Sequence, residues 1–196
     1  KPMSSFNLAK STTKKLVRLL HQKDKWHRQT ALRMLADRKD PAAIPLLKAM
    51  LSKESGQASL EAFWAINLCG GFNPEFTMQT LQHSNPQVRA WTVRLLGDEK
   101  IVPEVVARSL EDLARREPHV EVRGQLAATA KRLPVGQALP IIRELSKHNA
   151  DAGDIYQPLM VWWSLESKAG DHPAEVLDLF EDKSFWQESL IREHIL

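Results

Sequence analysis

A segment of about fourteen residues recurs along this chain, and the recurrence constrains the fold more than any other feature of the sequence. Residues 24–37 align with residues 85–98 at an offset of 61 residues: Arg28 matches Arg89, the paired apolar positions match, and both copies end in a small residue followed by aspartate. One copy lies between these two and two weaker copies follow, with key positions at residues 28, 59, 89, 123 and about 158. Intervals of 30–35 residues suit a helix–turn–helix unit that buries its apolar face against its neighbours.

Each unit is predicted to contain two helices, because apolar side chains recur at helical spacing and no segment alternates like a strand. The first helices are expected at residues 11–22, 41–53, 73–83, 103–116, 135–148 and 173–182. Start signals place a proline at the first helical position, as in Asp40-Pro41, Asn73-Pro74, Asn85-Pro86 and His172-Pro173. Stop signals are Gly70-Gly71 and Gly97.

These patterns together predict an all-α fold, an α–α superhelix of about five to six antiparallel helix pairs. Residues 1–196 are expected to form a single repeat array. The chain opens with Lys1-Pro2-Met3 and ends inside an apolar pattern, so we interpret it as a fragment of a longer protein.

The recurring arginine has two interpretations. In the segment 85–89, the side chain of Arg89 is expected to lie on the seam between repeats, where it can bond side chains or carbonyls of the preceding repeat. Arg28, Arg89 and Arg123 would then form a structural ladder along the stack. The alternative is an exposed row of cations that binds an anionic ligand, and we favour the ladder.

The turn in residues 86–89 and the apolar stripe that follows it resemble the HEAT repeat. The resemblance is clearest at residues 24–37 and 85–98. It is weakest after residue 150, where Gln157-Pro158 stands in place of the arginine. The resemblance implies a non-catalytic protein-interaction or spacer module that uses the groove formed by the second helices.

A narrower resemblance is carried by residues 26–36 and 40–47. They look like the HEAT region of large exported proteins of planctomycete and verrucomicrobial bacteria. In those proteins a sugar-dehydrogenase-like propeller precedes the repeats and a c-type haem domain follows. The resemblance implies a location outside the cytoplasm, with flanking domains of the same chain as partners.

Motifs that would indicate catalysis, a metal or a nucleotide are missing from the sequence. None of the seven histidines has HExxH spacing, and no GxGxxG, Walker-type or GxSxG motif occurs. The lone cysteine, Cys69, is interpreted as a small core residue near a helix end. We therefore expect no enzyme activity, no cofactor and no metal from these residues. No apolar stretch approaches the ~20 residues that a membrane-spanning helix needs.

Charge is distributed unevenly along the chain. Residues 1–40 hold 11 Lys/Arg against 3 Asp/Glu, although the whole chain has a formal net charge of +3. Such an asymmetry can mark an anionic partner, and a solvated helix face is the other interpretation. The candidate partner-binding residues in this region are Lys14, Arg18, Lys25 and Arg28. They make nucleic-acid binding the alternative function, including that of a HEAT-like alkylpurine DNA glycosylase.

Six tryptophans are present. Trp64 and Trp91 lie within apolar stripes and are expected in the core. Trp162 and Trp163 are adjacent, so their side chains point about 100° apart on a helix. Both can be buried only if the helix is covered on two sides. Core packing is the favoured interpretation, but they are also candidate partner-binding residues because exposed tryptophan is a good binding anchor.

Overall fold

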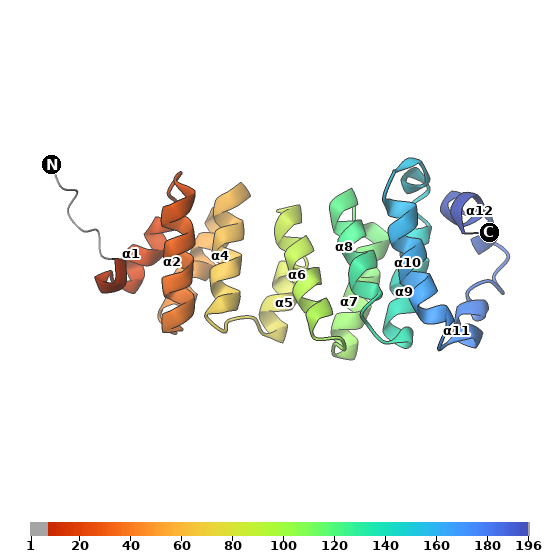
Figure 1. Cartoon of the computed structure of the whole chain (residues 1–196), viewed down its shortest axis with the longest axis horizontal. Helices are drawn as coiled ribbons and strands as arrows, with labels where there is room; N and C mark the ends of the chain where they lie inside the picture. The colour runs from red at the N-terminus through yellow and green to blue at the C-terminus, as the bar shows by residue number, and fades with distance from the viewer. Residues whose placement is uncertain (1–7, 196) are drawn as a thin grey trace. The chain divides into compact units, whose positions relative to one another are not determined.

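The computed structural model describes residues 8–195, so the chain opening at Lys1-Pro2-Met3 and the last residue lie outside the described part. Within residues 8–195 there are twelve α-helices and no strand, which confirms the predicted all-α, HEAT-like class (Figure 1). The α-helices are α1 (Thr13–Leu19), α2 (Lys25–Arg38), α3 (Ala43–Lys53), α4 (Gly56–Leu68), α5 (Pro74–Thr80), α6 (Pro86–Asp98), α7 (Glu104–Arg116), α8 (Val120–Ala130), α9 (Val135–Ser146), α10 (Gln157–Ala169), α11 (Pro173–Asp178) and α12 (Ser189–His194). Three short 3-10 turns are η1 (Leu8–Lys10), η2 (Asn149–Gly153) and η3 (Phe185–Gln187).

The chain divides into two compact units, residues 1–77 and residues 78–196, and α5 contributes to both. In the first unit α1 packs on α2 and α3, and α4 packs on α2 and α3. The first helices of successive pairs are therefore neighbours, and so are the second helices.

The second unit repeats this arrangement. The second helices α6, α8 and α10 form one layer, because α8 packs against both of the others. The first helices α7 and α9 pack on each other beside that layer, and α10 also contacts α11 and α12. The layer of second helices leaves one of its sides to solvent, and that side carries the candidate site described below.

Helix starts follow the predicted caps with one exception. The Asn85 side chain accepts a hydrogen bond from the Gln87 N–H at 2.9 Å, and Pro86 opens α6 as expected. The Asp24 carboxylate caps α2 in the same way. At Asp40-Pro41 the prediction is early by two residues, because α3 begins only at Ala43.

Helix stops are confirmed at one of the two predicted glycine sites. Gly70 adopts the left-handed conformation, with φ of 80°, directly after α4. The prediction for Gly97 is wrong, because this glycine lies inside α6 and the left-handed residue is Lys100. A Cβ at Gly97 would lie 2.9 Å from Thr129 Oγ1 on α8, so the glycine permits close approach of the two helices.

The core is built from the predicted helical stripes. Leu16 and Leu20 of the first pair are fully buried, and in the same unit Phe63 stacks on Phe76 with ring centroids 6.0 Å apart. Cys69 is buried at the end of α4, as predicted, and its thiol donates a weak hydrogen bond to the Leu35 carbonyl. Burial raises the pKa of this thiol, which suits a structural residue.

The recurring arginines are structural, as the ladder interpretation predicts. In the second unit Arg89 donates from Nε to Glu117 Oε2 at 2.8 Å, and from Nη1 to the His83 carbonyl at 2.7 Å. Arg123 repeats the pattern with Asp151, at 2.6 Å from Nε, and with the Glu117 carbonyl at 2.9 Å. Each arginine thus ties the loop before its own helix to a carboxylate further along the chain.

One detail of the ladder differs from the prediction. The carboxylate partners belong to the following helix pair, not to the preceding one: Arg28 bonds Glu61 at 2.9 Å in the first unit, as Arg89 bonds Glu117 in the second. The carbonyl partners come from the turn inside the arginine's own pair, such as Gln22 for Arg28. Because these bonds occupy most of the N–H donors of each guanidinium group, few donors remain to bind an anionic ligand.

The Arg123–Asp151 pair offers a test of the ladder, because both side chains are at least nine-tenths buried. We expect Arg123→Ala to lower the free energy of unfolding by about 3–5 kcal/mol, since the Asp151 carboxylate is left buried without its counter-charge. Urea unfolding followed by circular dichroism measures this change. The matched control is Arg108→Ala, which removes a pair that is about three-quarters exposed and should cost under about 1 kcal/mol. Equal losses for the two variants would contradict the structural role of Arg123.

Candidate functional site

The candidate site is the exposed side of the layer formed by α6, α8 and α10, which we call the second-helix face. It follows from the repeat register. Because Arg89, Arg123 and Gln157 are equivalent positions, Trp91, Gln125 and Leu159 are equivalent as well. Likewise Arg94, Ala128 and Trp162 occupy one register position, and Gln87, Glu121 and Ile155 another. These side chains are exposed or half-buried, so the same helical stripe faces solvent in all three repeats.

The first hollow on this face lies where α6 meets α8. It holds about 220 Å³ and is lined by Gln87, Ala90, Trp91, Arg94, Glu121 and Gln125. Gln87 donates to Glu121 at 2.5 Å across the seam. The guanidinium of Arg94 lies over the Trp91 ring, 4.9 Å from its centroid. The hollow therefore offers an aromatic surface within a polar rim.

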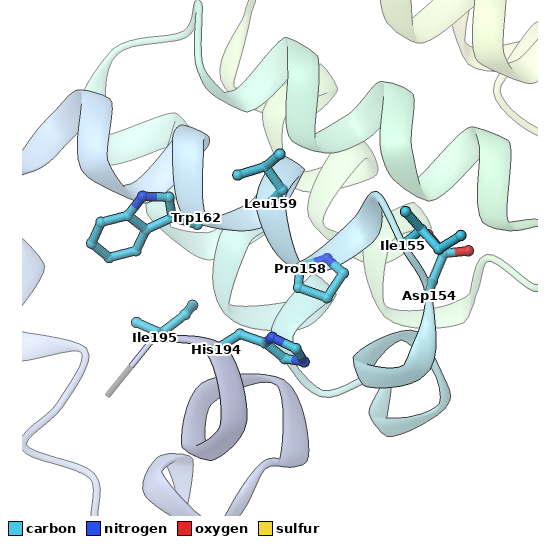
Figure 2. Close-up of a pocket in the computed structure, with 7 residues that line it drawn as sticks. All are labelled: Asp154, Ile155, Pro158, Leu159, Trp162, His194 and Ile195. Atoms are coloured by element: carbon cyan, nitrogen blue, oxygen red, sulfur yellow. The ribbon is translucent and has the colours of Figure 1, made fainter.

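The second hollow lies between the start of α10 and the end of α12. Figure 2 shows Leu159 and Trp162 of α10 on one side, Ile195 and His194 on the other, and Pro158 between them. It holds about 280 Å³, and Asp154 and Ile155 complete its lining. Its residues 155, 158, 159 and 162 are spaced i, i+3, i+4 and i+7, as are residues 87, 90, 91 and 94 of the first hollow. Both hollows thus use one helical stripe, repeated along the layer.

Short bonds hold the walls of the second hollow in place. His194 and the Ala152 carbonyl are joined through His194 Nε2 at 2.9 Å, and the Ser189 N–H donates to Asn149 at 2.7 Å. These bonds attach α12 to η2. On the α10 side, Asp154 accepts the N–H of Tyr156 at 2.8 Å and that of Gln157 at 2.9 Å, and so fixes the turn that leads into the helix.

Both candidate tryptophans of α10 reach the surface. Trp162 is 39% exposed and Trp163 is 45% exposed, so the prediction that they pack in the core is wrong. Trp162 lines the second hollow, whereas Trp163 lies outside its lining and beside the ammonium of Lys131, at 5.9 Å. Trp91, also expected in the core, is only half-buried and lines the first hollow.

The basic candidates lie in the first unit and do not form a single cluster of free cations. Lys14 and Arg18 are exposed and one helical turn apart on α1, and Lys25 is exposed at the start of α2. Arg28 is different, because its side chain is only 16% exposed and bonds Glu61 and two carbonyls. Lys14, Arg18 and Lys25 can therefore bind a partner without breaking a buried ion pair, whereas Arg28 cannot.

Sequence reasoning missed several members of the second-helix face, namely Ile155, Leu159, Trp91 and His194. A usable signal was present for the first three. Once the arginine positions are aligned, each stands at a fixed distance from Arg89 or its equivalent and therefore faces the same side. His194 gave no such signal, because its place in the hollow depends on how α12 folds back onto η2.

Other kinds of site find little support in the part of the chain that the structure describes. No group of three or more His, Cys, Asp or Glu side chains there could hold a metal ion. Among the described helices, none is both long and apolar enough to cross a membrane.

Comparison with known proteins finds a family match for one part of the chain. Residues 7–67 match the family model of HEAT repeats. No curated protein matches the chain. The twelve described helices and their repeated packing are those of a HEAT-like helical repeat, in the matched region and in the second unit alike.

The turn held by Asp154, just before α10, predicts a measurable pH dependence. Hydrogen bonds from the backbone N–H groups of Tyr156 and Gln157 hold the pKa of Asp154 below its ordinary value. The charged carboxylate therefore stabilises the fold above that ordinary value, and the stabilisation is lost as the pH falls towards the lowered pKa. We expect Asp154→Asn, which can still accept these N–H groups but cannot ionise, to lose less stability than the wild type between about pH 5 and pH 2. Urea unfolding at both pH values measures this, and parallel losses in the two proteins would contradict it.

Proposed function

We propose that this chain is a non-catalytic protein-interaction or scaffold module, and that a partner polypeptide binds the second-helix face of residues 78–196. The observation that carries the proposal is the pair of hollows at equivalent helical positions. Trp91 stands in one hollow, and Leu159 and Trp162 stand in the other. A single stripe that repeats along a layer of second helices suits an extended ligand, and helical repeats characteristically use such extended surfaces.

The chemistry of the face supports a protein partner. Trp162 is 39% exposed and lines one side of the second hollow, and tryptophan is among the residue types enriched at the energetic centres of protein–protein interfaces. The neighbouring Ile155 is 83% exposed. Exposed apolar side chains gathered on one face indicate an interaction surface.

Buried ionisable groups support a non-catalytic role. Glu117 and Asp151 are buried, but each carboxylate is held by an arginine of the ladder. Lys168 is buried as well, and its ammonium donates to the carbonyls of Lys131 and Leu133 at 2.8 and 2.7 Å. These groups connect repeats instead of facing a cleft where they could transfer a proton.

The partner that we propose is a flanking domain of the same parent chain. The narrower resemblance in residues 26–36 and 40–47 supports this, because in proteins of that kind repeats separate a propeller from a haem domain. Residues 1–196 would then act as one repeat array, outside the cytoplasm, that positions the two domains. The redox chemistry would belong to those domains.

Binding to the flanking domains of the parent chain, produced separately, tests the proposal by isothermal titration calorimetry. We expect Leu159→Ala with Trp162→Ala to weaken binding at least about tenfold, because the apolar anchor site is removed. Val105→Ala on α7 is the matched control: Val105 is 59% exposed but lies on a first helix, so affinity should not change. Equal affinities for wild type and the double variant, or no binding by the wild type, would contradict the proposal.

Nucleic-acid binding is the second candidate function, and the exposed pair Lys14 and Arg18 on α1 favours it. If it holds, random duplex DNA should shift in a gel at low ionic strength, and added salt should abolish the shift. Lys14→Glu with Arg18→Glu should then remove most of the binding, whereas Lys183→Glu, in the other unit, should not. No shift at low ionic strength rejects this function. Release of an alkylated base from treated DNA would specifically indicate the glycosylase.

A further inference from the structure

The second hollow lies in the most acidic part of the chain. Residues 149–195 hold ten Asp/Glu and three Lys/Arg. Of the three cations, Lys168 is buried against two backbone carbonyls, and Arg192 is paired with Glu193 at 2.8 Å. Two of the acids are paired with arginines from earlier helices, Asp151 with Arg123 and Asp182 with Arg143, but the remaining acids still outnumber the cations, so the surface of this region is net negative.

Acidic groups also adjoin the hollow itself. Asp154 is part of its lining, and none of the seven lining residues is lysine or arginine. Glu166 is exposed and follows Trp162 by four residues on α10, which places the two side chains next to each other on one face. Asp154 is a lasting source of negative charge, because the backbone N–H groups of Tyr156 and Gln157 lower its pKa.

We propose that the hollow between α10 and α12 binds a basic polypeptide segment that carries a bulky apolar anchor. The inference rests on the proposed function and names the chemistry of its partner. The anchor would enter the space between Trp162, Pro158 and Ile195 (Figure 2). The flanking Lys or Arg side chains would lie towards Asp154, and towards Glu166 one turn beyond Trp162 on α10. Charge complementarity of this kind speeds association and selects against acidic partners.

The first hollow is less suited to such a segment. It contains the guanidinium of Arg94, which lies over Trp91, and its one carboxylate, Glu121, already accepts a hydrogen bond from Gln87. A cationic ligand there would meet a like charge. The two hollows therefore differ in electrostatic preference although they share a helical stripe.

A peptide pair tests the proposal on the full chain. One peptide is an amphipathic sequence of Lys, Leu and Phe, and the other has Glu in place of every Lys. We expect calorimetry to show binding of the basic peptide and none of the acidic one. Trp162→Ala should weaken binding at least about tenfold, because it removes the main apolar wall. The affinity for the basic peptide should also fall as salt rises from about 50 to 500 mM, because screening weakens the charge contacts.

Charge variants separate electrostatic recognition from simple hydrophobic binding. We expect Asp154→Asn with Glu166→Gln to lower the affinity for the basic peptide several-fold and to make that affinity less dependent on salt concentration. The Oδ1 atom of asparagine at position 154 can still accept the N–H groups of Tyr156 and Gln157, so the turn that leads into α10 is kept. The matched control is Asp178→Asn with Glu181→Gln, which removes the same charge from exposed residues outside the lining and should leave affinity unchanged.

Three results would overturn the proposal. Equal binding of the acidic peptide would show that charge does not select the partner. Unchanged affinity in Trp162→Ala would place the peptide elsewhere. Self-association in sedimentation velocity that Trp162→Ala abolishes would make a second copy of this chain the occupant, through its basic residues 1–40. The flanking domains separate this inference from the proposed function. If Trp162→Ala abolishes their binding but Asp154→Asn with Glu166→Gln does not, the proposed function stands and only the basic-segment inference fails.

Discussion

The second unit depends on a continuous chain of buried arginine–carboxylate contacts. Arg89 bonds the carboxylate of Glu117, the carbonyl of Glu117 bonds Arg123, and Arg123 bonds Asp151. Removing charges from water is costly and is compensated only when donors and acceptors meet in good geometry, so such a chain tolerates little rotation of one helix on the next. It therefore keeps the exposed stripes of α6, α8 and α10 aligned and makes one continuous face of them.

The arginine ladder ends at α10, and this changes which side chains lie at the surface there. Gln157 replaces the arginine, and its amide donates to the Val120 carbonyl at 3.0 Å. Gly124 permits this, because a Cβ there would lie 2.9 Å from the Gln157 nitrogen. A neutral amide needs no carboxylate from the next pair. At this end of the ladder Asp154 lines the second hollow and Glu166 lies one helical turn beyond Trp162, so these acids adjoin the hollow instead of holding a ladder arginine.

The site could be predicted only in part from the sequence. Trp162 was identifiable as a candidate because adjacent tryptophans cannot both face one core. The arginine spacing identified the helices that form the face, and alignment of the arginine positions places Trp91 in the same register as Leu159. His194 could not be found in this way, because its place in the second hollow depends on how α12 packs onto η2. The sequence did not separate a protein-interaction module from a nucleic-acid-binding one either, because its uneven charge and its tryptophans are compatible with both.

The sequence by itself determined the helical class, the repeat interval, most helix starts to within two residues and the positions of the structural arginines, because all of these follow from local periodicity and capping. Tertiary structure alone decided which acid each arginine meets. Arg28 finds Glu61 inside a helix, whereas Arg89 finds Glu117 before one. It also decided that α12 folds back to close the second hollow. These outcomes depend on packing between distant segments, where several acids or apolar side chains satisfy the local pattern equally well.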